Sequence, residues 1–330
     1  MTNEAGSSTT AGTGSPGSRP VRDPAGLTAP AAVGLALLTL GWLGAMIWSA
    51  RAQLRGAEFA EIAITVAANA VPVLAQGALV AGLGAGLLAS NLLVRRGRTN
   101  ASTRFLAATG AGLLVGTVAA LTVHFTYYSG TANMVLAGTT VAAATIGGAV
   151  AGFLLTPAAG AVAAGTLTAY LMVLALSLFT DNLRSLFGAG ETQESQVAAA
   201  QWVSRTSSLA AGLAAGLVVF AYLRWSLRRA QAHSKTLGLP PYLLAGAGTG
   251  LLLLIAEAIT QFGGRSILDV AGSLSEADSI VQRVIGGSRW DHAIIVLFVG
   301  ALAAVIAYGR TLEPKRHPED EAQESAAVSR

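Results

Sequence analysis

Glu257 is an acidic residue inside an apolar run, Leu254 to Ile259. An ionised carboxylate is costly against lipid, so this group must face protein or water, or carry a proton. Gln261 follows one helical turn later on the same face, and His124 lies near the end of an earlier apolar run. We predict that Glu257, Gln261 and His124 line a polar cavity or proton path. The alternative is a structural carboxylate that hydrogen-bonds a neighbouring helix.

Other residue types that do chemistry form no convincing set. The chain has no cysteine, which excludes thiolate catalysis, disulfides and cysteine metal sites. Its four histidines are widely spaced and predict no metal site. Glu58 and Glu61 invite comparison with a membrane glycosyltransferase, but Arg55 and Glu58 are explained more simply as a solvated helical pair. We therefore expect no enzymatic activity, no cofactor and no metal.

The composition is that of a protein that spans a membrane several times. Of the 330 residues, 53% are hydrophobic and only 12% are charged, too few to cover a water-exposed surface. The 39 glycines allow membrane helices to approach closely. Although the net charge is +4, the basic residues adjoin apolar runs, so the expected partner is the lipid bilayer and not nucleic acid.

Apolar runs predict an all-α, polytopic membrane helix bundle of about eight transmembrane helices. A proline, Pro72, with Asn69 and Gln76 nearby, predicts a helix kink in the second of them. In the long link 263–289, apolar residues at helical spacing predict one or two short amphipathic helices on the membrane surface. The eight predicted spans are 27–50, 66–94, 105–125, 134–155, 158–179, 205–223, 242–262 and 292–308.

Two clusters of arginine set the expected orientation. The first contains Arg95, Arg96 and Arg98, and the second contains Arg228 and Arg229. If both clusters face the cytoplasm, 14 of the 21 basic residues lie on that side, as the positive-inside rule requires. Residues 1–26 and 310–330 are then disordered cytoplasmic tails. The preference for arginine over lysine and the excess of alanine and glycine indicate a bacterial plasma membrane.

The chain resembles one four-helix unit used twice. Residues 79–88 match residues 209–218 at seven of ten positions, with an offset of 130. Residues 105–116 match residues 243–254 at six of twelve positions, with an offset of 138. Because alanine, glycine and leucine dominate these segments, chance identity is the competing explanation. A duplication divides the chain into a first half, 27–155, and a second half, 156–309, in a 4+4 parallel internal repeat.

Two classes of function fit these features. The intramembrane acid and the repeat favour a small-solute transporter or channel-like permease. The lack of a catalytic set and the amphipathic link 263–289 favour a non-catalytic membrane subunit or scaffold of a cell-envelope or secretion complex, which would have a membrane-protein partner. The sequence names neither a solute nor a partner.

Overall fold

The fold is described from a computed structural model, which places residues 28–55, 60–126, 131–229, 238–273 and 276–311. Throughout these residues the regular secondary structure is α-helical, and eight helices are long and apolar enough to cross a membrane. The predicted fold class is therefore confirmed, and the two predicted disordered tails lie almost wholly outside the described residues. The helices are α1 (Ala32–Arg55), α2 (Ala60–Arg95), α3 (Ala101–Thr126), α4 (Thr131–Phe153), α5 (Thr156–Ser177), α6 (Thr180–Leu186), α7 (Gln193–Arg229), α8 (Leu239–Gly263), α9 (Arg265–Ser273) and α10 (Glu276–Gly309).

Several helices run further than the apolar runs predict. α7 begins at Gln193, twelve residues before the predicted sixth span, and α6 occupies part of the predicted link. α9 is one predicted amphipathic helix, but a second separate one is wrong, because α10 continues from Glu276 through Gly286 and Gly287 into the eighth span. Hydropathy marks only the lipid-embedded part of a helix, while backbone hydrogen bonding continues into its polar turns.

The chain reverses abruptly between α4 and α5. Only Leu154 and Leu155 separate these helices, and Pro157 lies in the first turn of α5, where its missing N–H is tolerated. Buried Arg104, at the start of α3, donates from Nη2 to the carbonyl oxygens of Leu154 (2.8 Å) and Gly152 (3.4 Å). The carbonyl groups at the C-terminus of α4 thus gain a charged donor instead of being left unpaired.

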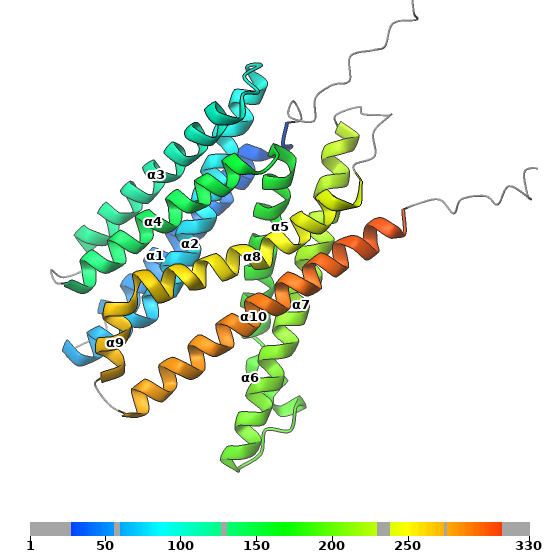
Figure 1. Cartoon of the computed structure of the whole chain (residues 1–330). Helices are drawn as coiled ribbons and strands as arrows, with labels where there is room; N and C mark the ends of the chain where they lie inside the picture. The colour runs from blue at the N-terminus through cyan, green and yellow to red at the C-terminus, as the bar shows by residue number, and fades with distance from the viewer. Residues whose placement is uncertain (1–27, 56–59, 127–130, 230–237, 274–275, 312–330) are drawn as a thin grey trace, which may run out of the picture.

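Both described ends of the chain lie at the end of the bundle that carries the arginine clusters (Figure 1). The Ala29 amide donates to Asn91 Oδ1 (2.8 Å), just before the first cluster, and Tyr222 donates to the Pro30 carbonyl just before the second. At the other terminus, Tyr308 of α10 stacks on Tyr242 at the start of α8, with ring centroids 4.6 Å apart. α6 and the first turns of α7 extend from the opposite end (Figure 1).

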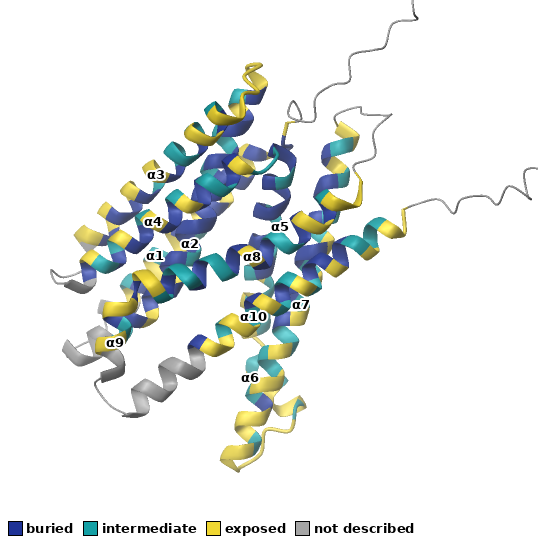
Figure 2. Cartoon of the chain, viewed as in Figure 1, coloured by how far each residue is buried: buried dark blue, intermediate teal, exposed yellow. Residues whose placement is uncertain are grey.

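Closely packed glycines hold each set of helices together. In the first half, Gly82 of α2 lies against Ala144 of α4, and Gly112 of α3 lies against Gly148 of α4. Among the later helices, Gly300 of α10 contacts Gly246 of α8. Buried residues follow these inner faces, whereas exposed apolar side chains line the outer faces, as expected for helices surrounded by lipid (Figure 2).

Cysteine labelling can test the predicted threading, because the natural chain contains no cysteine. Ser102 and Ser185 are exposed at opposite ends of the bundle. In intact cells we expect a membrane-impermeant maleimide to modify Ser185→Cys and to leave Ser102→Cys unmodified until the cells are opened. Labelling of Ser102→Cys first would reverse the orientation, and labelling of both from outside would contradict a single threading.

Candidate functional site

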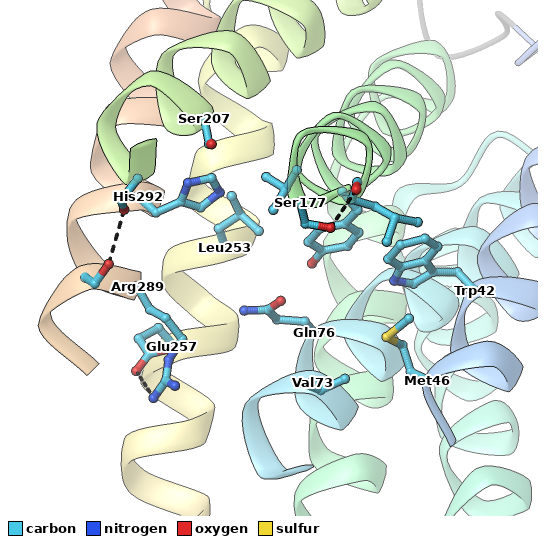
Figure 3. Close-up of a pocket in the computed structure, with 15 residues that line it drawn as sticks. Trp42, Met46, Val73, Gln76, Ser177, Ser207, Leu253, Glu257, Arg289 and His292 are labelled. Atoms are coloured by element: carbon cyan, nitrogen blue, oxygen red, sulfur yellow. Dashed lines mark hydrogen bonds and ion pairs between the residues drawn. The ribbon is translucent and has the colours of Figure 1, made fainter. Parts of the chain in front are cut away.

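A cavity of about 520 Å³ lies between the two halves of the bundle. α1 and α2 contribute its walls on one side, and α5, α7, α8 and α10 contribute the rest (Figure 3). Trp42 lies at the middle of α1, and the other lining positions fall in the half of each helix that is remote from the arginine clusters. In the predicted orientation the cavity therefore belongs to the outer half of the membrane.

Glu257 is at the wall of this cavity, and its carboxylate is held by three hydrogen bonds. Arg289 donates from Nε to Oε2 (2.9 Å) and from Nη2 to Oε1 (3.4 Å), and Gln261 Nε2 donates to Oε1 (2.8 Å). The Glu257 side chain is only 1% exposed, whereas that of Arg289 is 22% exposed. The carboxylate accepts three hydrogen bonds and is enclosed, so the guanidinium is the accessible partner of this ion pair.

A second polar group, His292, lies one helical turn after Arg289 on α10 and also lines the cavity. Its Nδ1 is 2.7 Å from Ser208 Oγ. Ser208 already donates its hydroxyl hydrogen to the Ser204 carbonyl (2.8 Å), so it must accept a hydrogen bond from the Nδ1–H of His292. The neutral imidazole then keeps Nε2 as a hydrogen-bond acceptor, with no partner in the described part of the chain.

The remaining wall is mainly apolar and aromatic. Trp42 of α1 stacks on Tyr170 of α5, with ring centroids 5.4 Å apart and planes 6° from parallel. Met46, Val73 and Leu253 extend this surface. Such a site, apolar except for a few convergent polar groups, has the general character of a small-molecule pocket.

The structure brings together some of the residues that the sequence singles out and separates others. Glu257 and Gln261 are bonded to each other, while His124 is exposed at the end of α3 and does not line this cavity. Pro72 is buried within α2, which continues through it, and neighbouring Val73 reaches the cavity. The topology-setting Arg95, Arg96, Arg98, Arg228 and Arg229 lie exposed at the far end.

Sequence reasoning missed Arg289 and His292 as members of the site. Arg289 counted only as a basic residue outside the predicted eighth span, and His292 only as one of four scattered histidines. A signal for Arg289 existed, because an arginine beside the outer end of one span can pair with an acid near the outer end of another. The sequence does not show which helix faces meet, so it could not select this pair.

A second groove lies between α1 and α3 in the first half, with a volume of about 500 Å³. Under the predicted duplication, several of its positions are the counterparts of residues that line the cavity. Four α1 residues of the groove lie 126 positions before the four α5 residues of the cavity. The α1 residues are Gly44, Ile47, Trp48 and Arg51, and the α5 residues are, in the same order, Tyr170, Val173, Leu174 and Ser177. Adding 138 to Val115 and Ala119 of α3 gives Leu253 and Glu257 of α8. The first groove thus has alanine where the cavity has its carboxylate.

The fold and the cavity define a polytopic membrane helix bundle whose apolar helices would contact the lipid bilayer. No family model, curated protein or solved structure matches this chain.

Proposed function

We propose that the protein is a small-solute transporter or channel-like permease of the bacterial plasma membrane, and that the cavity between its halves binds the solute. The observation that carries this proposal is the ion pair of Glu257 and Arg289 at the wall of an intramembrane cavity. Buried charges within a membrane are expensive and commonly mark solute or ion pathways. A purely structural pair would need no cavity of this size beside it.

The predicted duplication of a four-helix unit, if it holds, places the cavity where two repeats meet, and a set of glycine contacts favours it. Gly82 of α2 packs on Ala144 of α4. Gly212 of α7, 130 residues after Gly82, packs on Val299 and Val296 of α10. Ala108 of α3 lies against Gly148 of α4. Gly246, 138 residues after Ala108, likewise lies against Gly300, 152 residues after Gly148. The sequence offsets of 130 and 138 thus pair residues that both lie at close contacts between helices, which favours the predicted duplication. In transporters built from such repeats, the solute lies where the repeats meet.

Alternating access gives the proposal its test. Ser207 of α7 lines the cavity, and Leu209 on the same helix is 47% exposed on the lipid-facing surface. We expect a charged methanethiosulfonate reagent to modify Ser207→Cys from the outside in whole cells and from the inside in inverted vesicles. Leu209→Cys should react from neither side, because thiolates form in water and not in lipid.

The side from which Ser207→Cys can be labelled distinguishes the two candidate functions. Modification of Ser207→Cys from both sides supports transport, and modification from the outside alone would leave a cavity with no route across the membrane. Complete protection of Ser207→Cys would show that water does not enter the cavity and would contradict a solute site.

A non-catalytic membrane subunit or scaffold of a cell-envelope or secretion complex is the second candidate. The observation that favours it is the exposed apolar surface on α6 and the adjoining turns of α7, beyond the main bundle (Figures 1 and 2). There Trp202 is 54% exposed, with Phe187 stacked on it at 6.4 Å and the Arg205 guanidinium 5.7 Å from its ring centroid. A membrane-protein partner could cover this surface, and one-sided labelling of Ser207→Cys is what this candidate predicts.

A further inference from the structure

We propose that the cavity selects a small organic carboxylate with an apolar body and a hydrogen-bond donor next to the carboxylate, the class that includes apolar amino acids. This inference rests on the proposed function, because it assigns the solute class of the same cavity. It follows from the donors of Arg289 and the acceptor of His292 that have no partner within the described residues.

Arg289 supplies the anion-binding group. A guanidinium carries five N–H donors, and Glu257 uses one on Nε and one on Nη2. Three N–H groups on Nη1 and Nη2 have no acceptor in the described residues. These two nitrogens form the second edge of the planar guanidinium, which matches the two oxygens of a carboxylate. Glu257 fixes the orientation of Arg289 by holding the first edge.

The same contacts argue against a simple cation as the solute. A cation would need the Glu257 carboxylate, but that group already accepts three hydrogen bonds and is 1% exposed. Freeing it would leave the Arg289 charge unpaired in a mostly apolar wall. Binding to the free edge of Arg289 breaks none of these bonds.

His292 supplies a matching acceptor. Its Nε2 lone pair is free once Nδ1–H donates to Ser208. Positions 289 and 292 are three residues apart on α10, so the two side chains lie on neighbouring parts of one helix face. A solute carboxylate on Arg289 thus places an adjacent ammonium or hydroxyl group on the side of His292.

Charge balance favours a zwitterion within this class. The ion pair of Glu257 and Arg289 is already neutral, so a simple carboxylate would add one uncompensated negative charge to an intramembrane cavity. An amino acid brings its own ammonium group and leaves the site neutral. Its side chain would contact the surface formed by Trp42, Tyr170 and Leu253.

Protection of Ser207→Cys against the methanethiosulfonate reagent tests the proposal with three matched probes. L-phenylalanine has both polar groups, 3-phenylpropanoate lacks the amine, and L-phenylalaninamide lacks the carboxylate. At ten times its dissociation constant, L-phenylalanine should slow labelling about tenfold, because the unoccupied fraction falls as 1/(1 + [L]/Kd). We expect weaker protection by 3-phenylpropanoate and none by L-phenylalaninamide at equal concentration.

The double variant Glu257→Gln/Arg289→Gln provides the control in the Ser207→Cys background. It removes both buried charges together, so neither is left unpaired, and a monodisperse elution profile would report that it folds. We expect it to be labelled at the unprotected rate with or without L-phenylalanine.

The outcomes distinguish this inference from the function on which it rests. Protection by L-phenylalaninamide equal to that by L-phenylalanine, protection that survives in the double variant, or labelling unaffected by all three probes would overturn the carboxylate assignment while the cavity remained water-accessible. Absence of labelling in the unliganded protein would instead remove the proposed solute site.

Discussion

Arg289→Ala is expected to destabilise the folded protein by about 3–5 kcal/mol, because it leaves a buried carboxylate without its charged partner. The Glu257 side chain is 1% exposed and would keep only the hydrogen bond from Gln261 Nε2 (2.8 Å). One amide donor cannot replace the two charge-assisted N–H donors of a guanidinium. Thermal unfolding in mild detergent, monitored by tryptophan fluorescence, should show a lower melting temperature for Arg289→Ala.

Glu257→Gln is the partner measurement for this prediction. It leaves Arg289 unpaired, but that side chain is 22% exposed to the cavity and can be hydrated there. We therefore expect a smaller loss of stability than for Arg289→Ala. The double variant Glu257→Gln/Arg289→Gln should recover much of the loss, since a neutral amide pair carries no unpaired charge. Arg289→Gln supplies the second single variant of the cycle. If the loss of stability in the double variant equalled the sum of the losses in Glu257→Gln and Arg289→Gln, the ion pair would contribute no coupling energy.

The sequence predicted the number and approximate depth of the spans because hydropathy is a local property. Glu257 and Gln261 could also be placed together, since four residues separate them on one helix. The partners from other helices could not be predicted in this way. Arg289 reaches Glu257 only because α8 and α10 pack along Gly246, Gly250 and Gly300, and no local pattern specifies that rotation.

The separation of His124 from Glu257 has the same origin. His124 lies near the C-terminal end of α3, which corresponds to α8 under the proposed duplication, so its predicted depth resembles that of Glu257. However, the two side chains belong to different halves, and His124 packs beside Phe125 on the exposed side of α3, with its carbonyl accepting from Asn133 Nδ2 (3.1 Å). Equal depth in the membrane does not imply a common cavity.

The glycine contacts that rotate the helices into place also predict the second large effect. Gly147 of α4 lies directly against the carbonyl oxygen of Leu79 on α2, where even a β-carbon would overlap the backbone. Gly147→Leu must separate the two helices, and we expect a loss of stability at or above the upper end of the about 1–3 kcal/mol typical of overpacked cores. Gly138, on the same helix, faces open space and provides the matched control.

The two substitutions differ in packing alone, because both replace glycine by leucine in α4. Gly138→Leu should leave the melting temperature unchanged or raise it slightly, since leucine favours a helix by about 1 kcal/mol relative to glycine. Gly147→Leu should lower the melting temperature and increase the aggregated fraction on size exclusion. It should also expose Ser207→Cys to rapid labelling that L-phenylalanine no longer slows, because α2 forms one wall of the cavity through Val73 and Gln76. If Gly147→Leu melted like Gly138→Leu, the close contact of α2 with α4 would be wrong, and with it the packing that places this wall.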